Sequence, residues 1–77
     1  MTIDPEAGEL VYVQLAAILR ELIASGGLAR RVPSVKTLAQ QYGVSHGSAE
    51  RALAVLRDEE LIYPVTGRGY FVAGEQR

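Results

Sequence analysis

The chain has 77 residues, enough for one small domain with a modest hydrophobic core. It contains no cysteine and one histidine, so disulfide bonds and cysteine-ligated zinc are excluded and we expect neither a metal site nor a cofactor. No apolar run approaches the roughly 18 residues that span a bilayer, and residues 1–6 are polar and acidic. We therefore expect a cytoplasmic protein with no membrane partner.

Charge is unevenly distributed along the chain, although the formal net charge is only -1. Residues 1–29 carry four acids and one base, whereas residues 30–57 carry five bases and one acid. Three consecutive acids, Asp58, Glu59 and Glu60, follow at once. A locally basic segment within a nearly neutral chain makes residues 30–57 the natural place to seek a contact with a polyanion.

Residues 1–9 show no periodicity and predict a flexible lead-in. In residues 10–23 apolar side chains recur at helical spacing, which predicts a first helix. The residues of this stripe are Tyr12, Leu15, Ala16, Leu19, Leu22 and Ile23. Residues 25–27, Ser-Gly-Gly, are expected to end that helix, because glycine readily adopts the left-handed conformation. Residues 28–32 are expected to form a short, extended connector.

Two short amphipathic helices follow. Ser34 is expected to cap the second helix, and Gly43 to end it. Its buried stripe is predicted to be Val35, Leu38, Ala39 and Tyr42. Ser45 is expected to cap a third helix that ends near residues 58–60, with Ala49, Ala52, Leu53 and Leu56 facing the core. Because only residues 43–45 separate these helices, the pattern predicts a helix-turn-helix.

A β-hairpin is predicted after the third helix. Residues 61–63 and 70–72 favour strands, and residues 66–69 form a turn with two glycines. Pro64 suits an edge strand. Leu61, Ile62 and Phe71 are the predicted contacts with the helices, and residues 74–77 read as a loose tail. The predicted fold class is mainly α with a small β-hairpin, a three-helix winged helix-turn-helix over residues 10–73, and such domains most commonly read duplex DNA.

Three segments in this order resemble the DNA-binding domain of the GntR family of bacterial transcription regulators. Residues 33–39 (PSVKTLA) are similar to the start of the family's second helix, residues 42–53 (YGVSHGSAERAL) to its turn and recognition helix, and residues 67–72 (GRGYFV) to its wing. The resemblance implies a homodimer on a pseudo-palindromic operator, usually acting as a repressor. The recognition helix would enter the major groove and the wing tip the minor groove.

The chain departs from the family pattern in four ways. No small-molecule effector domain follows, so we expect either a minimal regulator or an excised domain. His46 stands where arginine is common, and Glu50 where a second arginine is expected, while Arg51 occupies a position that is often acidic. The connector at residues 29–32 is shorter than usual. The substitutions at 46 and 50 remove two positive charges from the expected interface.

The candidate DNA contacts are Ser34, Lys36, Ser45, His46, Gly47, Ser48, Glu50, Arg51, Arg57, Arg68 and Gly69. Lys36 is placed to meet a phosphate, and the free N–H groups at the start of the third helix suit another. Arg68, between two glycines, fits a narrow minor groove. Each also has an alternative role: a solvated surface residue, a helix cap or an ordinary turn.

Glu50 and Arg51 fall on the exposed side of the third helix. Arg51 could fork onto a guanine, and Glu50 could accept from a cytosine amino group or pair with a neighbouring arginine. Arg57 is expected to contact the DNA backbone or form a surface ion pair. Arg30 and Arg31 could add phosphate contacts or be solvated. Tyr12 and Tyr42 are expected in the core.

Sequence-specific binding of double-stranded DNA by a transcription regulator is the function we expect. The alternative is a winged-helix module that binds another protein and little or no DNA, which the near-neutral charge and the acids at 58–60 would favour. An enzyme is not expected, since the chain lacks cysteine and a phosphate-binding glycine loop after a strand.

Overall fold

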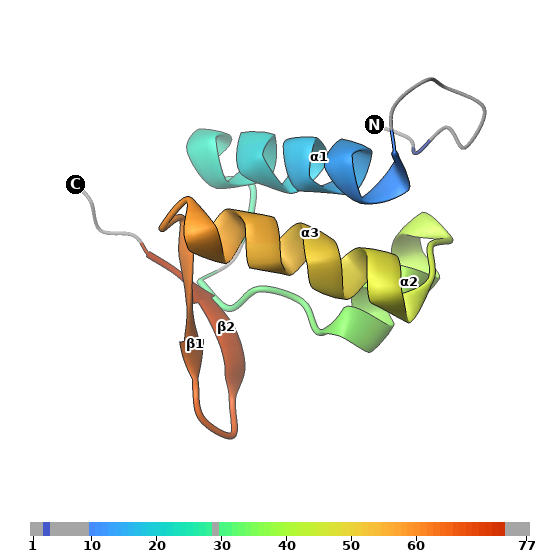
Figure 1. Ribbon diagram of the computed structural model, residues 1–77. Helices are drawn as coiled ribbons and strands as arrows, with labels where there is room; N and C mark the ends of the chain where they lie inside the picture. The colour runs from blue at the N-terminus through green and yellow to red at the C-terminus, as the bar shows by residue number, and fades with distance from the viewer. Residues whose placement is uncertain (1–2, 4–9, 29, 74–77) are drawn as a thin grey trace.

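In the computed structural model, residue 3 and residues 10–28 and 30–73 are described, and three helices are followed by a two-stranded hairpin (Figure 1). The elements are α1 (Val11–Ser25), α2 (Val35–Tyr42), α3 (His46–Asp58), β1 (Ile62–Val65) and β2 (Gly69–Val72). The predicted fold class is confirmed. The predicted lead-in and tail lie outside the described residues, except for Ile3, which packs against the core. None of the described helices is long and apolar enough to cross a bilayer.

Side-chain caps and glycines set the ends of the helices as the sequence predicted. The hydroxyls of Ser34 and Ser45 accept hydrogen bonds from the third backbone N–H of α2 and α3, at 3.1 and 3.0 Å. Gly26 and Gly43 end α1 and α2 with φ of 78° and 67°, the left-handed conformation that a side chain disfavours. The turn between α2 and α3 is therefore only three residues long.

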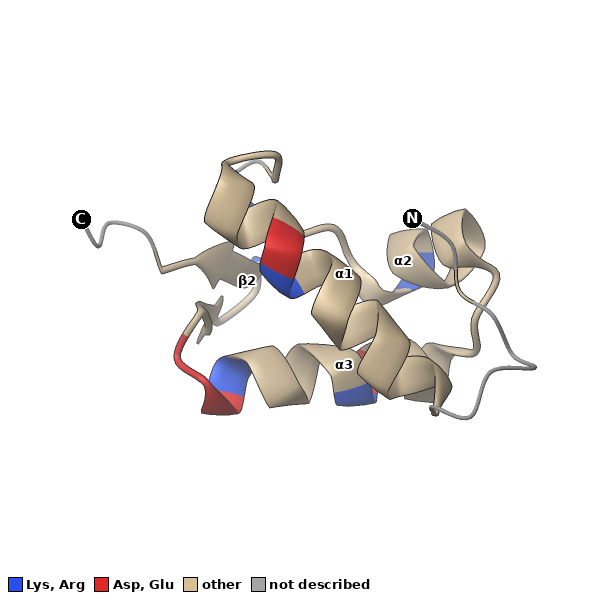
Figure 2. Cartoon of the chain, turned by 90° about the horizontal axis from the view of Figure 1, so that it is seen from above, with Lys and Arg blue, Asp and Glu red and all other residues tan. Residues whose placement is uncertain are grey.

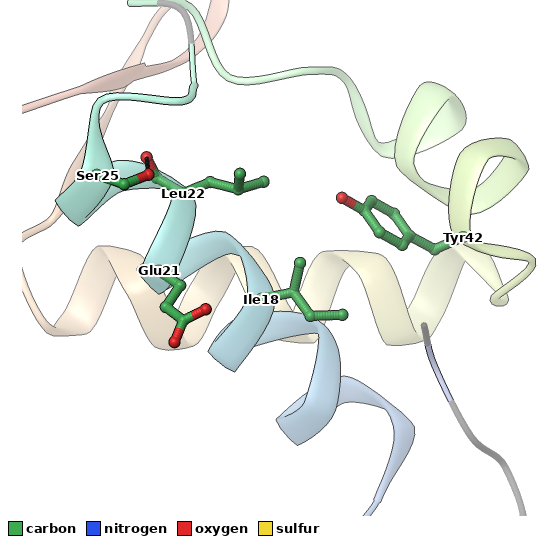
Figure 3. Close-up of a pocket in the computed structure, with 5 residues that line it drawn as sticks. All are labelled: Ile18, Glu21, Leu22, Ser25 and Tyr42. Atoms are coloured by element: carbon green, nitrogen blue, oxygen red, sulfur yellow. Dashed lines mark hydrogen bonds between the residues drawn. The ribbon is translucent and has the colours of Figure 1, made fainter. Parts of the chain in front are cut away.

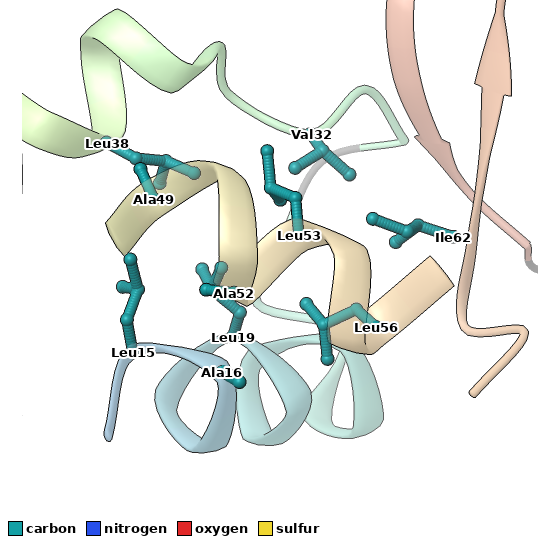
Figure 4. Close-up of a cluster of buried hydrophobic side chains, with 10 residues drawn as sticks. All are labelled: Leu15, Ala16, Leu19, Val32, Leu38, Ala49, Ala52, Leu53, Leu56 and Ile62. Carbon is teal, nitrogen blue, oxygen red and sulfur yellow. The ribbon is translucent and has the colours of Figure 1, made fainter. Parts of the chain in front are cut away.

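Helix α3 lies at the centre of the hydrophobic core. All four residues of its predicted stripe, Ala49, Ala52, Leu53 and Leu56, are buried. Figure 4 shows them facing α1 on one side and the segment with Val32 on the other. The α2 stripe is less completely buried than predicted, because Val35 and Tyr42 are half-exposed. Ile18 of α1 is buried although the predicted stripe omitted it.

The hairpin packs on the helices through one face only. Ile62 pairs with Val72 and Pro64 with Tyr70, and Ile62, Tyr70 and Val72 face the core. The prediction that Phe71 makes this contact is wrong. Phe71 pairs with Tyr63 on the outer face, where their ring centroids are 6.2 Å apart.

The connector before α2 pairs with β2 through an isolated β-bridge between Arg31 and Phe71, beside the two-stranded sheet. The Val32 N–H donates to the Tyr70 carbonyl, and the Val72 N–H donates to the carbonyl of Arg30. β2 is thus central and β1 lies at the edge, where the missing N–H of Pro64 costs no ladder hydrogen bond. Pro64 lies inside β1, so the strand is longer than the predicted residues 61–63.

One of the two acids that follow α3, Glu59, has an ion-pair partner. Glu59 forms a two-pronged ion pair with Arg20 of α1, at 2.7 and 2.9 Å. This contact lowers the pKa of Glu59 and raises the pKa of Arg20, chiefly through the hydrogen bonds. Glu60 has φ of 64° and turns the chain towards β1. The ion pair between Glu59 and Arg20 therefore links the end of α3 to α1.

Candidate nucleic-acid interface

The start of α3 presents backbone donors to solvent. Ser45 satisfies the N–H groups of Ser48 and Ala49, through its hydroxyl and its carbonyl. Within the described residues, the N–H groups of His46 and Gly47 have no such acceptor, and both residues are exposed. Unpaired N–H groups and the positive end of the helix dipole together favour an anion such as a phosphate.

Two features lie on the side of α3 that faces away from α1 (Figure 1). The hairpin tip projects past α3, and the start of α2, with exposed Lys36, lies on the same side. Arg68 is exposed at the tip, between Gly67 and Gly69 with φ of 77° and 92°. Both positive angles favour glycine, so the two glycines allow the tight turn that carries Arg68.

A hollow of about 380 Å³ separates the hairpin from α2 and α3. Ser34 and Val35 at the start of α2 line one wall, and Arg68 and Tyr70 line the opposite wall. Arg31 and Leu53 also line the hollow. Of the predicted DNA contacts, Ser34, Arg68 and Gly69 line this hollow. Lys36 and His46 are exposed but do not line it.

The side chain of Arg51 lies on the flank of α3 that faces α1. Its guanidinium is 4.5 Å from the ring centroid of Tyr12, so it covers an aromatic side chain of α1. Tyr12 is half-buried and packs against the core, as predicted. The base contact predicted for Arg51 stays a prediction, and it would require this cation to leave or share its place on the ring.

Arg57 and Glu50 differ in how they are paired. The guanidinium of Arg57 donates to the Asp58 carboxylate at 3.3 and 3.4 Å, and hydrogen bonding to Asp58, with a smaller contribution from Tyr70, raises the pKa of Arg57. Glu50 is exposed and has no hydrogen bond or ion pair with any other described residue. Arg57 thus matches the surface ion pair foreseen as one of its two roles.

The two capping serines and Ser48 have local structural roles. Ser34 donates its hydroxyl to Thr37 and Ser45 donates to Ser48, in addition to accepting from the backbone. Their predicted contacts with DNA remain predictions. Ser48 itself is half-buried, which leaves His46 and Gly47 as the more accessible part of the first turn.

Basic residues are scattered rather than gathered into one face. Figure 2 shows basic positions next to acidic positions on α1 and α3 and a basic position alone on α2, with an acidic segment that begins at the end of α3. Two of the acids in that segment, Asp58 and Glu59, are paired with arginines. The positive contribution at the interface therefore comes from a few exposed cations, above all Lys36 and Arg68.

Sequence reasoning did not predict that Arg31 and Tyr70 line the hollow beside the hairpin, or that Arg51 contacts the ring of Tyr12. The double arginine at residues 30 and 31 was the available signal for the first, and it was read only as an optional phosphate contact. The second depends on how α1 packs across α3, for which no local pattern exists.

A second hollow, of about 230 Å³, lies between α1 and the end of α2 (Figure 3). Tyr42 points across it towards Ile18 and Leu22, with Glu21 and Ser25 at its rim. None of the predicted DNA contacts lines it. In the part of the chain that is described, no group of three or more His, Asp or Glu side chains could hold a metal ion.

Comparison with known proteins identifies the family. The family described as "Bacterial regulatory proteins, gntR family" matches residues 11–72. The HTH-type transcriptional repressor NagR of Bacillus subtilis is 33% identical over 75 residues, which are 95% of this chain and 31% of NagR. The chain spans less than a third of the length of the curated relatives it matches.

Solved structures agree in fold. YtrA from Sulfolobus acidocaldarius, a GntR-family transcription factor, is 37% identical with a TM-score of 0.85, covering 96% of this chain and 80% of YtrA. The DNA-binding domain of AraR in complex with operator ORR3 is 31% identical with a TM-score of 0.75, covering 91% and 90%. The chain therefore belongs to the GntR family of bacterial regulatory proteins, and its fold is the winged helix of the family's DNA-binding domain.

Proposed function

We propose that this chain binds operator DNA as part of a transcription regulator that acts mainly as a repressor. Helix α3 enters the major groove, and the hairpin tip with Arg68 reaches the adjacent minor groove. One observation carries this proposal: the start of α2 and the hairpin tip are exposed on the side of α3 that faces away from α1 (Figure 1), and the first turn of α3 is exposed as well. The operator complex of the similar AraR domain adds support.

The proposed contacts divide into positioning and reading groups. Lys36 and the N–H groups of His46 and Gly47 bind phosphates, which fixes the helix in the groove. The side chains of His46 and Glu50, four residues apart on one flank of α3, meet base edges, and Ser48 donates to a phosphate or a base at the start of the helix. Arg68 supplies a cation to the electronegative minor groove. A bacterial repressor must reach its operator on the chromosome, so the proposed location is the cytoplasm.

Two copies are proposed to bind together. A single α3 offers few base contacts, and pairing on two half-sites about 10 base pairs apart would multiply the affinity. The operator should then be pseudo-palindromic.

Selection from a random-sequence duplex library, followed by sequencing, tests the proposal. We expect enrichment of a motif with two-fold symmetry and binding that weakens as salt rises. The opposite result would be no retained DNA at any salt concentration, together with capture of a protein partner at stoichiometric amounts. That result would favour the alternative function, a protein-interaction module.

A further inference from the structure

Glu50 and Arg51 lie on different flanks of α3. Adjacent residues of an α-helix point in directions about 100° apart, since the helix has 3.6 residues per turn. Arg51 covers Tyr12, which places its flank against α1. Glu50 is three residues before Leu53, and residues three or four apart are neighbours on a helix surface. Because Leu53 lines the hollow beside the hairpin tip, Glu50 lies on the flank that borders the proposed DNA surface.

In the free protein, Glu50 has no structural role that would explain it. It is exposed, and no described residue forms a hydrogen bond or ion pair with it. The helix positions four residues before and after it are His46 and Ala54, so no lysine or arginine faces it along α3. The two nearest cations on the helix have other partners, Arg51 on Tyr12 and Arg57 on Asp58.

An unpaired carboxylate on this flank restricts which DNA can bind. It is repelled by phosphates, and an ionised carboxylate only accepts hydrogen bonds. In the major groove, the available donors are the amino groups of cytosine and adenine. Adenine's amino group has an acceptor on each side, its own N7 and the thymine O4. Cytosine's amino group has an acceptor, guanine O6, on one side only. Cytosine is therefore the base that a carboxylate selects with the least repulsion.

We propose that Glu50 is a specificity-determining residue that accepts a hydrogen bond from a cytosine amino group and so selects one C·G pair in each half-site. This inference rests on the proposed function, because it requires α3 to lie in the major groove. A hydrogen bond to a charged acceptor favours the base that makes it about tenfold or more. At every other base the carboxylate weakens binding, so the same residue lowers affinity for non-specific DNA.

The test compares the motifs that four proteins select from a random-sequence duplex library: the wild-type chain, Glu50→Ala, Glu50→Gln and Glu21→Gln. Glu21 is a matched control, an exposed glutamate on α1 at the rim of the other hollow. The wild-type motif should contain one C·G pair per half-site that Glu50→Ala alone no longer selects. Glu50→Gln should prefer adenine at that position, since an amide both accepts and donates. Glu21→Gln should select the wild-type motif.

Affinity for non-specific duplex DNA gives a second readout. Glu50→Ala should bind random duplexes several-fold more tightly than the wild type, whereas the Glu21→Gln control should not. Unchanged melting temperatures would show that neither variant acts through unfolding.

The failures are distinguishable. If the wild type selects a motif and Glu50→Ala selects the same motif with the same strength at every position, the role of Glu50 is wrong and DNA binding stands. If the wild type retains no DNA, the proposed function fails, and this inference fails with it.

Discussion

The guanidinium of Arg51 lies 4.5 Å from the ring centroid of Tyr12, so a cation on the recognition helix is held against α1. A cation–π contact at a partly exposed site contributes about 0.5–1 kcal/mol. The contact links one flank of α3 to α1, and it leaves the other flank, with Glu50, exposed for the proposed contact with DNA.

Replacing Tyr12 tests whether this contact stabilises the fold. Tyr12→Leu should lower the free energy of unfolding by about 1 kcal/mol, because the apolar contact is partly kept and the cation–π attraction is lost. Tyr12→Phe should lose much less, since the ring remains. Urea unfolding measures the free energy of unfolding of both variants. In an Arg51→Ala background, Tyr12→Leu should lower this free energy only by the packing that is lost, because the cation is absent. An equal loss in both backgrounds would mean that Arg51 does not stabilise through the ring.

The Arg20–Glu59 pair predicts a pH-dependent part of stability. Arg20 lowers the pKa of Glu59 from its ordinary value of 4.5, so the folded protein binds this proton less readily than the unfolded chain. The stabilisation is therefore present above the ordinary pKa and is lost as pH falls through the lowered folded-state pKa. Since both side chains are about two-fifths exposed, solvent reduces the effect to about 0.5 kcal/mol.

Urea unfolding of the wild type and Glu59→Gln at neutral and strongly acidic pH measures this. The variant should be less stable at neutral pH and equal to the wild type when the carboxyl is protonated. The control variant Glu21→Gln replaces another exposed glutamate, which lies on α1. Its stability should match that of the wild type at both pH values. A difference that persists in acid would assign the effect of Glu59 to something other than its charge.

Ile62 should attach the hairpin to the helices. It is 2% exposed and belongs to the core cluster. Ile62→Ala should lower the free energy of unfolding by about 2–4 kcal/mol, as truncation of a buried isoleucine does. Tyr63→Ala, on the outer face against Phe71, should cost about 1 kcal/mol. Denaturant unfolding ranks the two, and the reverse order would contradict the assignment of the faces.

Gly47 offers a substitution that separates folding from DNA binding. A Cβ at this position would lie 3.9 Å from the Ser45 hydroxyl, an ordinary contact, and the residue has no positive φ. Gly47→Ala should therefore leave stability unchanged or raise it by up to about 0.5 kcal/mol. It should weaken DNA binding if the backbone approaches a phosphate there. Thermal unfolding and a duplex titration report the two effects, and unchanged binding would mean that DNA does not approach Gly47 closely.

Local signals were sufficient to predict the three helices and the turns. Ser34, Ser45, Gly26 and Gly43 each act within one turn of the chain, so their roles can be inferred without knowing the tertiary structure. The hairpin turn was predicted for the same reason, since Gly67 and Gly69 allow positive φ.

Which strand residues point towards the core could not be predicted in the same way. Residues 70–72 are three consecutive apolar residues, and without alternation the sequence does not indicate which of them points inward. Pairing of Ile62 with Val72 decides it and turns Phe71 outward. Contacts between distant residues, such as Arg20 with Glu59, 39 positions apart, depend on helix packing and have no local signature. The side chains that meet DNA remain predictions for a related reason, because no single local pattern separates a DNA contact from a solvated one.

The salt dependence of duplex binding, compared between the wild type and Lys36→Ala/Arg68→Ala, tests the central claim most directly. Each cation that displaces counterions contributes about 0.9 to the slope of log affinity against log salt, so the double variant should lose nearly two units of slope for each bound copy. Arg20→Ala, which removes a charge from α1 outside the interface, should keep the wild-type slope. An identical slope in the double variant would show that Lys36 and Arg68 do not form the surface that binds DNA.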